Sequence, residues 1–486
     1  MTFEERLRHW SRLGVHLGNN PLSLLGAALT TGAAVTLLWF WILEITSPRS
    51  VHPYIGVLLF LILPAVFLLG LLLIPVGLRR QRQKLYREGH LPTAYPKVDF
   101  HAPVVRNALL VLGGATVVNV ALMGTATYKG VEYMESNQFC GLTCHTVMAP
   151  EYAAFVDSAH SRVGCVQCPI GPGAGWYVRS KLSGLRQVFA VALGTYSRPI
   201  PSPVHHLRPA QETCEQCHWP QKFVGDKFLI KRKYADDEPN TPLYTVLALK
   251  VGGRSGQHAA GIHGAHLGET GRITYVTTDG RRQIIPRVTR RDDKGELVEY
   301  VSEDVKVTPE ELARGETRAM DCIDCHNRPT HAFELPERAV DRALSDGQMS
   351  RELPFIKKKG VELLRAEYPD HGTAERRIAQ SLADYYKESY PEVYRSHRGQ
   401  VEAAGGALFA IYKRNIFPEM RVTWGTHPNH VGHEDFPGCF RCHDESHKAK
   451  DGRTISQDCE TCHALLAQEE KDPAILKQMG VPLTGG

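Results

Sequence analysis

Twelve cysteines stand out among the 486 residues, because they fall into six close pairs and none is left over. Four pairs have the form C-x-x-C-H. A fifth, CGLTCH, has one residue more between its cysteines, and in the sixth, CVQCP, Pro169 stands where the histidine would be. The pairs are Cys140/Cys144, Cys165/Cys168, Cys214/Cys217, Cys322/Cys325, Cys439/Cys442 and Cys459/Cys462.

The C-x-x-C-H string is the attachment signature of c-type haem. Two thiols one helical turn apart can bond the two vinyl groups of one porphyrin, and the adjacent histidine then ligates the iron. Random placement would give on the order of 0.01 such strings at this composition, so four of them predict four covalent haems. CGLTCH predicts a fifth. The axial histidines that the motifs supply are His145, His218, His326, His443 and His463.

Disulfides and zinc sites are the alternatives for closely spaced cysteines. Disulfides suit an exported protein, but they do not require a histidine after the second cysteine. Zinc would need a fourth ligand at every site. CVQCP remains open to three interpretations: a haem with its axial ligand from elsewhere, a single thioether or no haem, or a small disulfide.

Electron-transfer haems usually take a second strong-field axial ligand, so further histidines are expected opposite the motif histidines. The first candidates lie beside Cys pairs, namely His160, His433 and His447. The others are His205, His206, His258, His263, His266, His331, His427 and His430. Met148 is a candidate ligand of the first haem. His427, His430 and His433 could alternatively form a zinc site.

Three stretches without charge, 22–43, 54–78 and 107–128, are each predicted to cross a lipid bilayer. The third is the weakest, and a buried core helix is its alternative. The basic segment 79–106 is predicted to stay in the cytoplasm, which also places the N-terminus inside. Every Cys pair then follows the last span. Because covalent haem attachment is extracytoplasmic in bacteria, we expect an inner-membrane protein with a periplasmic haem domain.

Composition excludes several classes of protein. Lys+Arg is 57 and Asp+Glu is 52, which is too even for a dedicated nucleic-acid binder. Charged residues are 22% and hydrophobic residues 43%, which excludes wholesale disorder. A mean hydropathy of −0.25 excludes a transporter that is embedded throughout its length.

The expected fold class is mainly α with much irregular structure, comprising three N-terminal transmembrane helices and an extracytoplasmic multihaem domain with a small β insertion. We expect a cytoplasmic N-terminus (1–21), the spans (22–128), a first haem domain (129–235), a β-rich insertion (236–320) and a C-terminal haem domain (321–486). Strand-like runs occupy 242–251, 272–278 and 296–302, whereas 332–390 has helical periodicity.

The strings NQFCGLTCHTVMAPEY, SAHSRVGCVQC and GPGAGWYVRSKLSG resemble the NapC/NirT family of membrane-anchored multihaem cytochromes, over about 107–235. The resemblance implies oxidation of menaquinol or ubiquinol at the outer membrane face and electron transfer to a periplasmic cytochrome or terminal reductase. It also implies that Lys181 matches a lysine near the first haem. Glu151 and Asp157 are further candidates to accept or steer protons, and structural ion pairs are their alternative role.

The sequence departs from the family pattern at two places. Both the Cys spacing and the Met spacing of the first motif are one residue longer, and Pro169 replaces the histidine of the second. Two other functions stay open. One is an electron-wiring subunit bound to other membrane subunits, without a quinol site of its own. The other is a terminal nitrite or hydroxylamine reductase with an open iron position at CVQCP.

Overall fold

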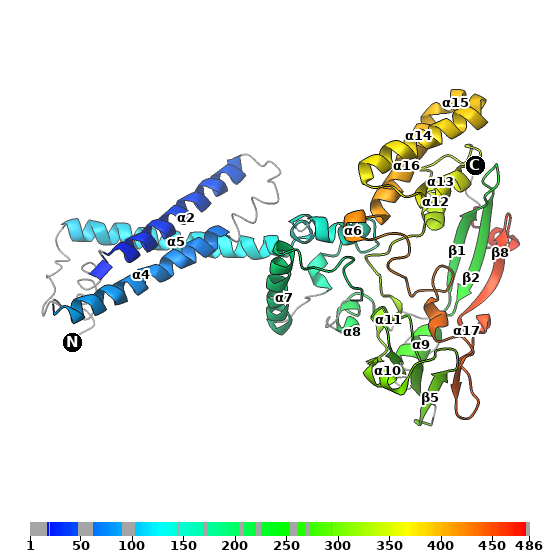
Figure 1. Cartoon of the computed structure of the whole chain (residues 1–486), viewed down its shortest axis with the longest axis horizontal. Helices are drawn as coiled ribbons and strands as arrows, with labels where there is room; N and C mark the ends of the chain where they lie inside the picture. Colours follow the sequence, from blue (N-terminus) through cyan, green and yellow to red (C-terminus); the bar gives the residue numbers. More distant parts are fainter. Residues whose placement is uncertain are drawn as a thin grey trace. The chain divides into compact units, whose positions relative to one another are not determined.

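The computed structural model describes residues 17–18, 20–46, 62–89, 103–143, 145–168, 174–203, 209–219, 225–252, 261–268, 273–292 and 294–482. The chain divides into two compact units, Met1–Thr143 and Cys144–Gly486. Most described elements are helices, and a small number of strands is present, as the sequence predicts (Figure 1).

The N-terminal unit contains three long helices, α2 (Pro21–Thr46), α4 (Leu63–Arg87) and α5 (Pro103–Met134). α2 and α4 approach closely through small residues. A Cβ atom added to Gly70 would lie 2.7 Å from the carbonyl oxygen of Gly26, so glycine is needed at this contact. The Ser23 hydroxyl also donates a hydrogen bond to the Ile74 carbonyl at 3.0 Å, which ties the two helices together.

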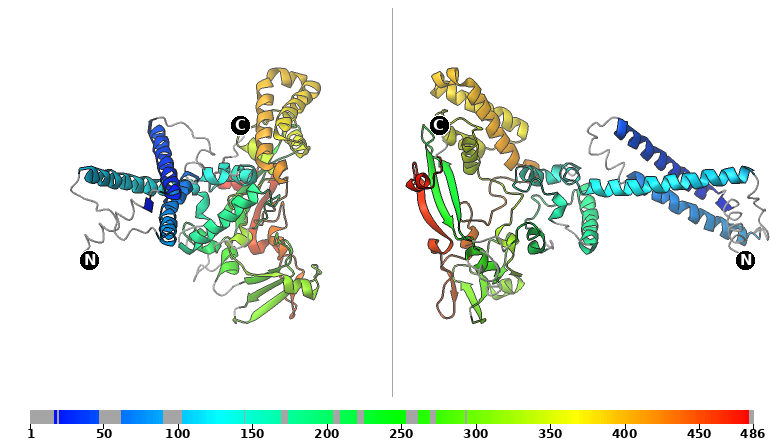
Figure 2. Two further views of the ribbon diagram at one scale, coloured as in Figure 1. Left: turned by 60° about the vertical axis from the view of Figure 1, so that its left-hand side comes forward. Right: turned by 180° about the vertical axis from the view of Figure 1, so that it is seen from behind.

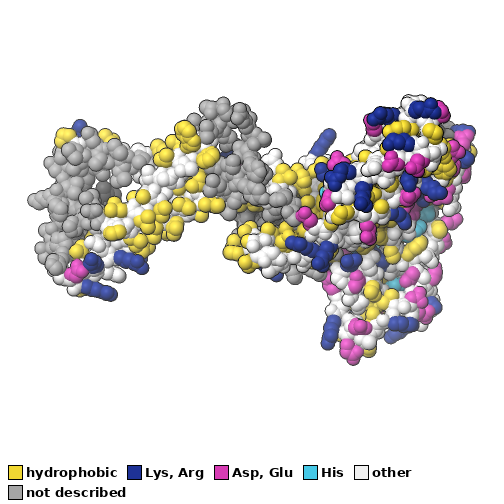
Figure 3. Space-filling model, turned by 45° about the horizontal axis from the view of Figure 1, so that its top comes forward, with side chains coloured by type: hydrophobic (Ala, Val, Ile, Leu, Met, Phe, Trp, Pro, Cys, Tyr) yellow, Lys and Arg dark blue, Asp and Glu magenta, His cyan; other side chains and the backbone are white. Residues whose placement is uncertain are grey.

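Two described helices are long and apolar enough to cross a membrane, Pro21–Phe40 and Leu63–Arg87. Their outward side chains are apolar, with Leu72 64% and Trp39 60% exposed, which suits lipid rather than water (Figure 3). The structure therefore supports two spans instead of three. The third predicted span is a helix, α5, but Gly, Thr and Asn interrupt its apolar sequence, and several of its side chains lie outside the described residues.

The segments that carry the Cys motifs consist of short elements joined by irregular chain. In chain order they are η2 (Phe139–Thr143), α6 (His145–Val156), η3 (Cys165–Gln167), α7 (Ala174–Ala192), α8 (Ala210–Cys214), α9 (Gly261–Leu267), α10 (Pro309–Arg314), α11 (Cys322–Cys325), η7 (Gly438–Arg441), α17 (Cys459–Cys462) and α18 (Ala474–Gln478).

Two antiparallel sheets connect distant parts of the larger unit. One has the order β1-β2-β8 and the other β6-β3-β4-β5-β7. The strands are β1 (Lys227–Tyr234), β2 (Pro242–Leu249), β3 (Ile273–Thr277), β4 (Arg287–Arg291), β5 (Leu297–Ser302), β6 (Glu316–Ala319), β7 (His447–Ala449) and β8 (His463–Glu470). The strand runs predicted in 242–251, 272–278 and 296–302 are confirmed. β7 and β8 join from the C-terminal region, so each sheet pairs segments far apart in sequence.

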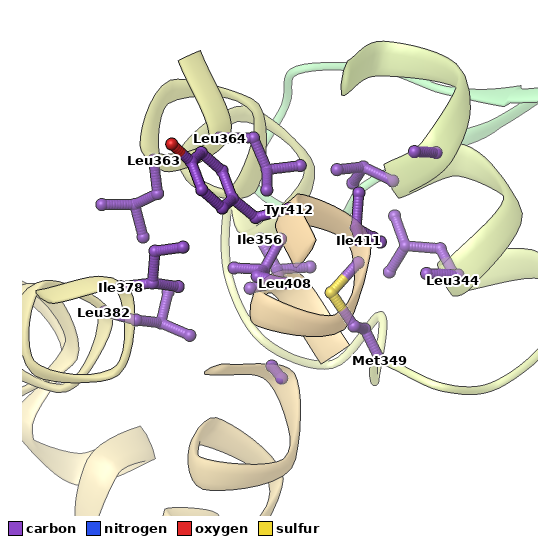
Figure 4. Packing of buried hydrophobic residues seen from close by; sticks show 14 of the residues in the cluster. Leu344, Met349, Ile356, Leu363, Leu364, Ile378, Leu382, Leu408, Ile411 and Tyr412 are labelled. Carbon is purple, nitrogen blue, oxygen red and sulfur yellow. The ribbon is translucent and has the colours of Figure 1, made fainter. Parts of the chain in front are cut away.

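A helical module, residues 336–415, lies beside the three-stranded sheet, and its first helix contacts β1 (Figure 2). It comprises α12 (Pro336–Ser345), α13 (Ile356–Arg365), α14 (His371–Ser389), α15 (Pro391–Ser396) and α16 (Arg398–Asn415), and a short turn, η6 (Pro418–Met420), follows. Pro336 occupies the first turn of α12, where proline is tolerated. Leu408, Ile378 and Leu382 are fully buried where α14 and α16 meet (Figure 4).

Candidate haem-binding sites

The four complete C-x-x-C-H motifs share one local geometry. In each, the backbone N–H of the motif histidine donates to the carbonyl of the first cysteine, which closes one helical turn. The bonds measure 2.8 Å for His218, 2.7 Å for His326 and 3.1 Å for His443, and His463 makes the same bond to Cys459. Each turn therefore presents two thiols and an imidazole from neighbouring positions, as covalent haem attachment requires.

The two thiols of the third motif, CEQCH, differ in burial. Cys214 is half-buried at the end of α8, whereas Cys217 is exposed. The backbone N–H of Cys217 still donates to the Cys214 carbonyl at 3.1 Å, so the turn that spaces the thiols is formed. Attachment of haem at Cys217 stays a prediction.

The CGLTCH motif begins in a wider turn. Cys140 lies in η2, a five-residue π-helical stretch. A π turn accommodates one residue more than an α turn, which is the extra residue of this motif. Cys144 and the side chain of His145 lie outside the described residues. Met148 follows on α6, half-buried, and its predicted axial role stays a prediction.

Each of the four complete motifs places its histidine opposite a second histidine. Two imidazoles that ligate one metal from opposite sides, each at about 2 Å, hold their ring centres about 6 Å apart. The observed separations fit this gap. They are 5.9 Å for His160–His218, 6.5 Å for His263–His326, 5.8 Å for His266–His443 and 6.3 Å for His433–His463.

Second hydrogen bonds orient several of these rings. The Nδ1 atoms of His160, His266 and His443 lie 3.1, 2.7 and 2.8 Å from the backbone carbonyls of Pro329, Ile262 and Ser456. A ring that donates from Nδ1 to a carbonyl keeps Nε2 as the acceptor, which is the usual arrangement of a metal-binding histidine. The side chains thus favour a metal on the side where the partner ring lies.

Burial also favours the neutral imidazoles that metal binding needs. It lowers the pKa of His326, of His266 and of His463, and neighbouring histidines lower each pKa further. His263 and His266 both lie on α9, three residues apart, so one short helix supplies the second histidine to two adjacent motifs.

The third and fourth motifs touch. The backbone N–H of Ala210, which begins α8, donates to the Asp321 carboxylate at 2.8 Å, and Asp321 caps α11. The thiols of Cys214 and Cys322 share a hydrogen bond that lowers the pKa of Cys214 and raises that of Cys322. Burial raises the pKa of the Cys168 thiol, and the charge of Cys214 raises it as well. The second motif therefore lies close to the third.

The fourth, fifth and sixth motifs continue the same series. Burial and, to a smaller extent, the nearby Cys439 raise the pKa of the Cys325 thiol to about 11. Burial raises the pKa of Cys442 to about 12, with Cys325 among its charged neighbours. Burial and Cys439 together raise the pKa of Cys462. The second to sixth motifs therefore follow one another in space in their order along the chain.

A buried polar cluster supports the fourth and fifth motifs. Asp324, between the cysteines of CIDCH, is 2% exposed and accepts hydrogen bonds from Tyr275 at 2.7 Å, Arg318 at 3.0 Å and Arg282 at 3.3 Å. Arg441, inside CFRCH, donates to the Asp324 carbonyl at 3.0 Å. The sequence analysis did not predict this cluster. The position of Asp324, a carboxylate between two haem-attaching cysteines, was the feature of the sequence that could have indicated it.

His447 is a correction to the predicted axial candidates. It is fully buried, its Nδ1 lies 2.8 Å from the Asp444 carboxylate, and its Nε2 lies 2.8 Å from the Ile285 carbonyl. Both ring nitrogens are engaged, so the histidine has a structural role and leaves no nitrogen for a metal. Its closeness to Cys442 in sequence was misleading.

The remaining histidine candidates divide into three groups. His331 has its Nδ1 2.9 Å from the Glu151 carbonyl, and its axial role stays a prediction without an observed partner ring. His427 stacks on Phe333, and His430 lies 3.0 Å from the Asp324 carbonyl. His433 instead faces His463. Among the described residues, no group of three or more ligands could hold a metal ion, which argues against a zinc site formed by His427, His430 and His433. His205, His206 and His258 lie outside those residues.

The proton-handling candidates are placed differently from one another. Glu151, on α6, forms an ion pair with buried Arg328 at 3.2 Å. Asp157 forms an ion pair with Arg414. These contacts match the structural alternative for both carboxylates. The backbone of Lys181 is part of α7, whereas its side chain lies outside the described residues.

CVQCP differs from the other motifs. Cys165 lies at the start of η3 and Cys168 just after its end, and the three interpretations of this pair stay open. The nearest described histidine in sequence, His160, faces His218 of the next motif instead. Pro169 lies outside the described residues.

The Cys motifs, the facing histidines and the two apolar helices define a membrane-associated multihaem c-type cytochrome. Over 454 residues the chain is 43% identical to cytochrome c-type protein ImcH of Geobacter sulfurreducens, an alignment that covers 93% of this chain and 88% of that protein. The chain belongs to the ImcH family of cytochrome c-type proteins, and it carries covalently bound haem c. No family model and no solved structure matches it.

Proposed function

We propose that this cytochrome oxidises menaquinol or ubiquinol at the outer face of the bacterial inner membrane and delivers the electrons to a periplasmic cytochrome or terminal reductase. The observation that carries the proposal is the continuous series of motifs, four of them with facing histidines. Such a series suits electron transfer along the chain. The resemblance of 107–235 to the NapC/NirT family favours quinol as the electron donor.

We assign His160, His263, His266 and His433 as the second axial ligands of the third, fourth, fifth and sixth motifs. Bound haem would supply reversible one-electron transfer. The protein would hold each haem through two thioether bonds, and the opposed imidazoles would leave no open position at these four motifs. This argues against a terminal reductase at any of the four, because reduction of nitrite needs an open iron position.

The first two motifs have less complete ligand sets. For CGLTCH the proposed ligands are His145 with Met148 or His331. For CVQCP we propose thioether attachment without a proximal histidine, which gives six haems in all. The intact mass of the purified protein counts the haems directly, and a mass equal to five would contradict attachment at Cys165 and Cys168.

The quinol site is proposed near the first motif, as the NapC/NirT resemblance implies. Oxidation of a quinol releases two electrons and two protons, so a polar group must orient the ring and guide the protons. Lys181 is the leading candidate, because ion pairs occupy Glu151 and Asp157. Membrane topology is part of the proposal: the apolar helices anchor the chain in the inner membrane, and the motifs are periplasmic.

Anaerobic stopped-flow reduction tests the proposal. Purified oxidised protein in detergent is mixed with a reduced menaquinone analogue, and the haem α-band is followed. We expect reduction within seconds that a quinol-site inhibitor blocks. Lys181→Met should slow this reduction by about 100-fold, whereas Lys358→Met, in the helical module, should not change it.

Full reduction by dithionite with none by quinol would contradict quinol oxidation by this chain. That result would favour a wiring subunit, and stable co-purification with other membrane subunits would support that function. An unchanged rate in Lys181→Met would remove the lysine alone from the mechanism.

A further inference from the structure

α7 (Ala174–Ala192) exposes an apolar face. Leu182, Leu185, Phe189 and Leu193, just past its end, recur at spacings of three and four residues and therefore share one side of the helix. Their side chains are 66%, 56%, 59% and 73% exposed. A row of large apolar side chains this exposed is unusual on a water-facing surface and marks an interaction site.

The charge around α7 has a single sign. From Ser158 to Gln211 the chain contains no aspartate or glutamate. The same stretch has six basic residues, Arg162, Arg179, Lys181, Arg186, Arg198 and Arg208. Elsewhere on the face of the larger unit that Figure 3 shows, acidic and basic side chains are intermixed. An acid-free basic stretch complements an anionic surface.

The basic residues of α7 lie beside its apolar row. Arg179 precedes Leu182 by three residues, and Arg186 follows it by four, so both belong to the same side of the helix as the row or to its border. Long basic side chains at the border of an apolar face can reach phosphates while the apolar face enters the acyl region.

We propose that α7 lies in the lipid interface of the membrane that α2 and α4 span, with its apolar row among the acyl chains and its arginines on anionic headgroups. The occupant is a lipid surface, because the chain already carries membrane-spanning helices and the stretch is both apolar and purely basic. The proposal does not depend on quinol being the electron donor. It gives the haem-bearing unit a second membrane contact besides its covalent link to the spans.

Photo-crosslinking to lipid tests the proposal on the full-length holoprotein. The protein is placed in nanodiscs of phosphatidylcholine, with or without phosphatidylglycerol, that contain a phospholipid with a diazirine on its acyl chain. After irradiation, mass spectrometry locates lipid-modified peptides, and labelling of α2 and α4 serves as the internal standard. We expect modification of the peptide that follows Arg186, which contains Phe189.

Variants separate the two parts of the contact. Leu185→Gln with Phe189→Gln should reduce labelling of this peptide by about fivefold. Leu297→Gln, a residue 65% exposed on β5, is the matched control and should leave it unchanged. Arg179→Gln with Arg186→Gln should reduce labelling only in discs that contain phosphatidylglycerol, whereas Arg395→Gln with Arg398→Gln should have no effect.

Two results would overturn the proposal. Labelled spans with no label in α7 would show that its apolar face does not enter the bilayer. Protection of α7 from hydrogen exchange in native membranes, but not in lipid nanodiscs, would assign the face to a protein partner instead. An unchanged haem α-band in each variant shows that the holoprotein remains folded.

Discussion

In the helical module (336–415), Leu353, Ile356 and Leu364 are fully buried among other apolar side chains. In the motif-bearing segment 139–219, by contrast, the buried hydrophobic side chains of the described part are Val147, Ala154 and Phe155. Apart from residues 139–143, both regions belong to the second compact unit, Cys144–Gly486. The module encloses its own apolar core, whereas the motif segments surround facing histidines. Bound haem must therefore supply the buried apolar surface that the side chains of the motif segments lack.

Withholding haem gives the largest expected difference between the two regions. In full-length chain produced without haem attachment, we expect protease to cleave 139–219 rapidly, because few apolar contacts hold it, while the module stays protected. Limited proteolysis with mass spectrometry measures both rates, and the holoprotein is the control. Equal cleavage of both regions would contradict the account.

Asp324→Asn tests the polar support of the motif region. The substitution removes the buried carboxylate that Arg318 and Arg282 contact and leaves both cations only the exposed Glu316 as an ion-pair partner, which should cost about 3 kcal/mol of unfolding free energy. Denaturant unfolding followed at the haem band measures the loss. Glu299→Gln removes the partner of Arg287 in an exposed pair and should cost less than about 1 kcal/mol. Equal effects would show that burial adds nothing to the cluster.

The motif chemistry was predictable from sequence because attachment needs residues only one helical turn apart. All four facing histidines were among the sequence candidates, but their partners were not predictable, because His263 and His326, or His266 and His443, meet only through the tertiary fold. Closeness in sequence to a Cys pair identified His160 and His433 among the pairs but misidentified His447. β8 was missed for the same reason, since it pairs with β2 from the far end of the chain.

Leu408→Ala tests the apolar core of the module. Leu408 is fully buried on α16, so truncation should cost about 2–5 kcal/mol of unfolding free energy through lost burial and a residual cavity. Circular dichroism during thermal unfolding measures the change, and the haem absorption spectrum should not move. Leu297→Ala, at an exposed position, is the control. A changed haem spectrum in Leu408→Ala would contradict the independence of the two regions.

The pH dependence of stability gives a smaller effect. Burial lowers the pKa of His430 to about 4 from 6.5, so the unfolded chain gains a proton below about pH 6.5 while the folded chain does not. Stability therefore falls as the pH drops, by about 2 kcal/mol at pH 5. In His430→Asn, we expect the share of the decrease in unfolding free energy between pH 7 and pH 5 that comes from His430 to be absent. His397→Asn, in the helical module, gives the background, and an identical pH profile in both variants would contradict the assignment.

The assignment of facing histidines to one haem iron is tested most directly by electron paramagnetic resonance of the oxidised holoprotein. His263→Ala removes the ring opposite His326, whereas His447→Ala removes a histidine whose two nitrogens are already hydrogen-bonded. We predict that His263→Ala replaces one low-spin ferric signal with a high-spin signal and that His447→Ala leaves the low-spin signals unchanged. An unchanged spectrum in His263→Ala, or a new high-spin signal in His447→Ala, would contradict the assignment.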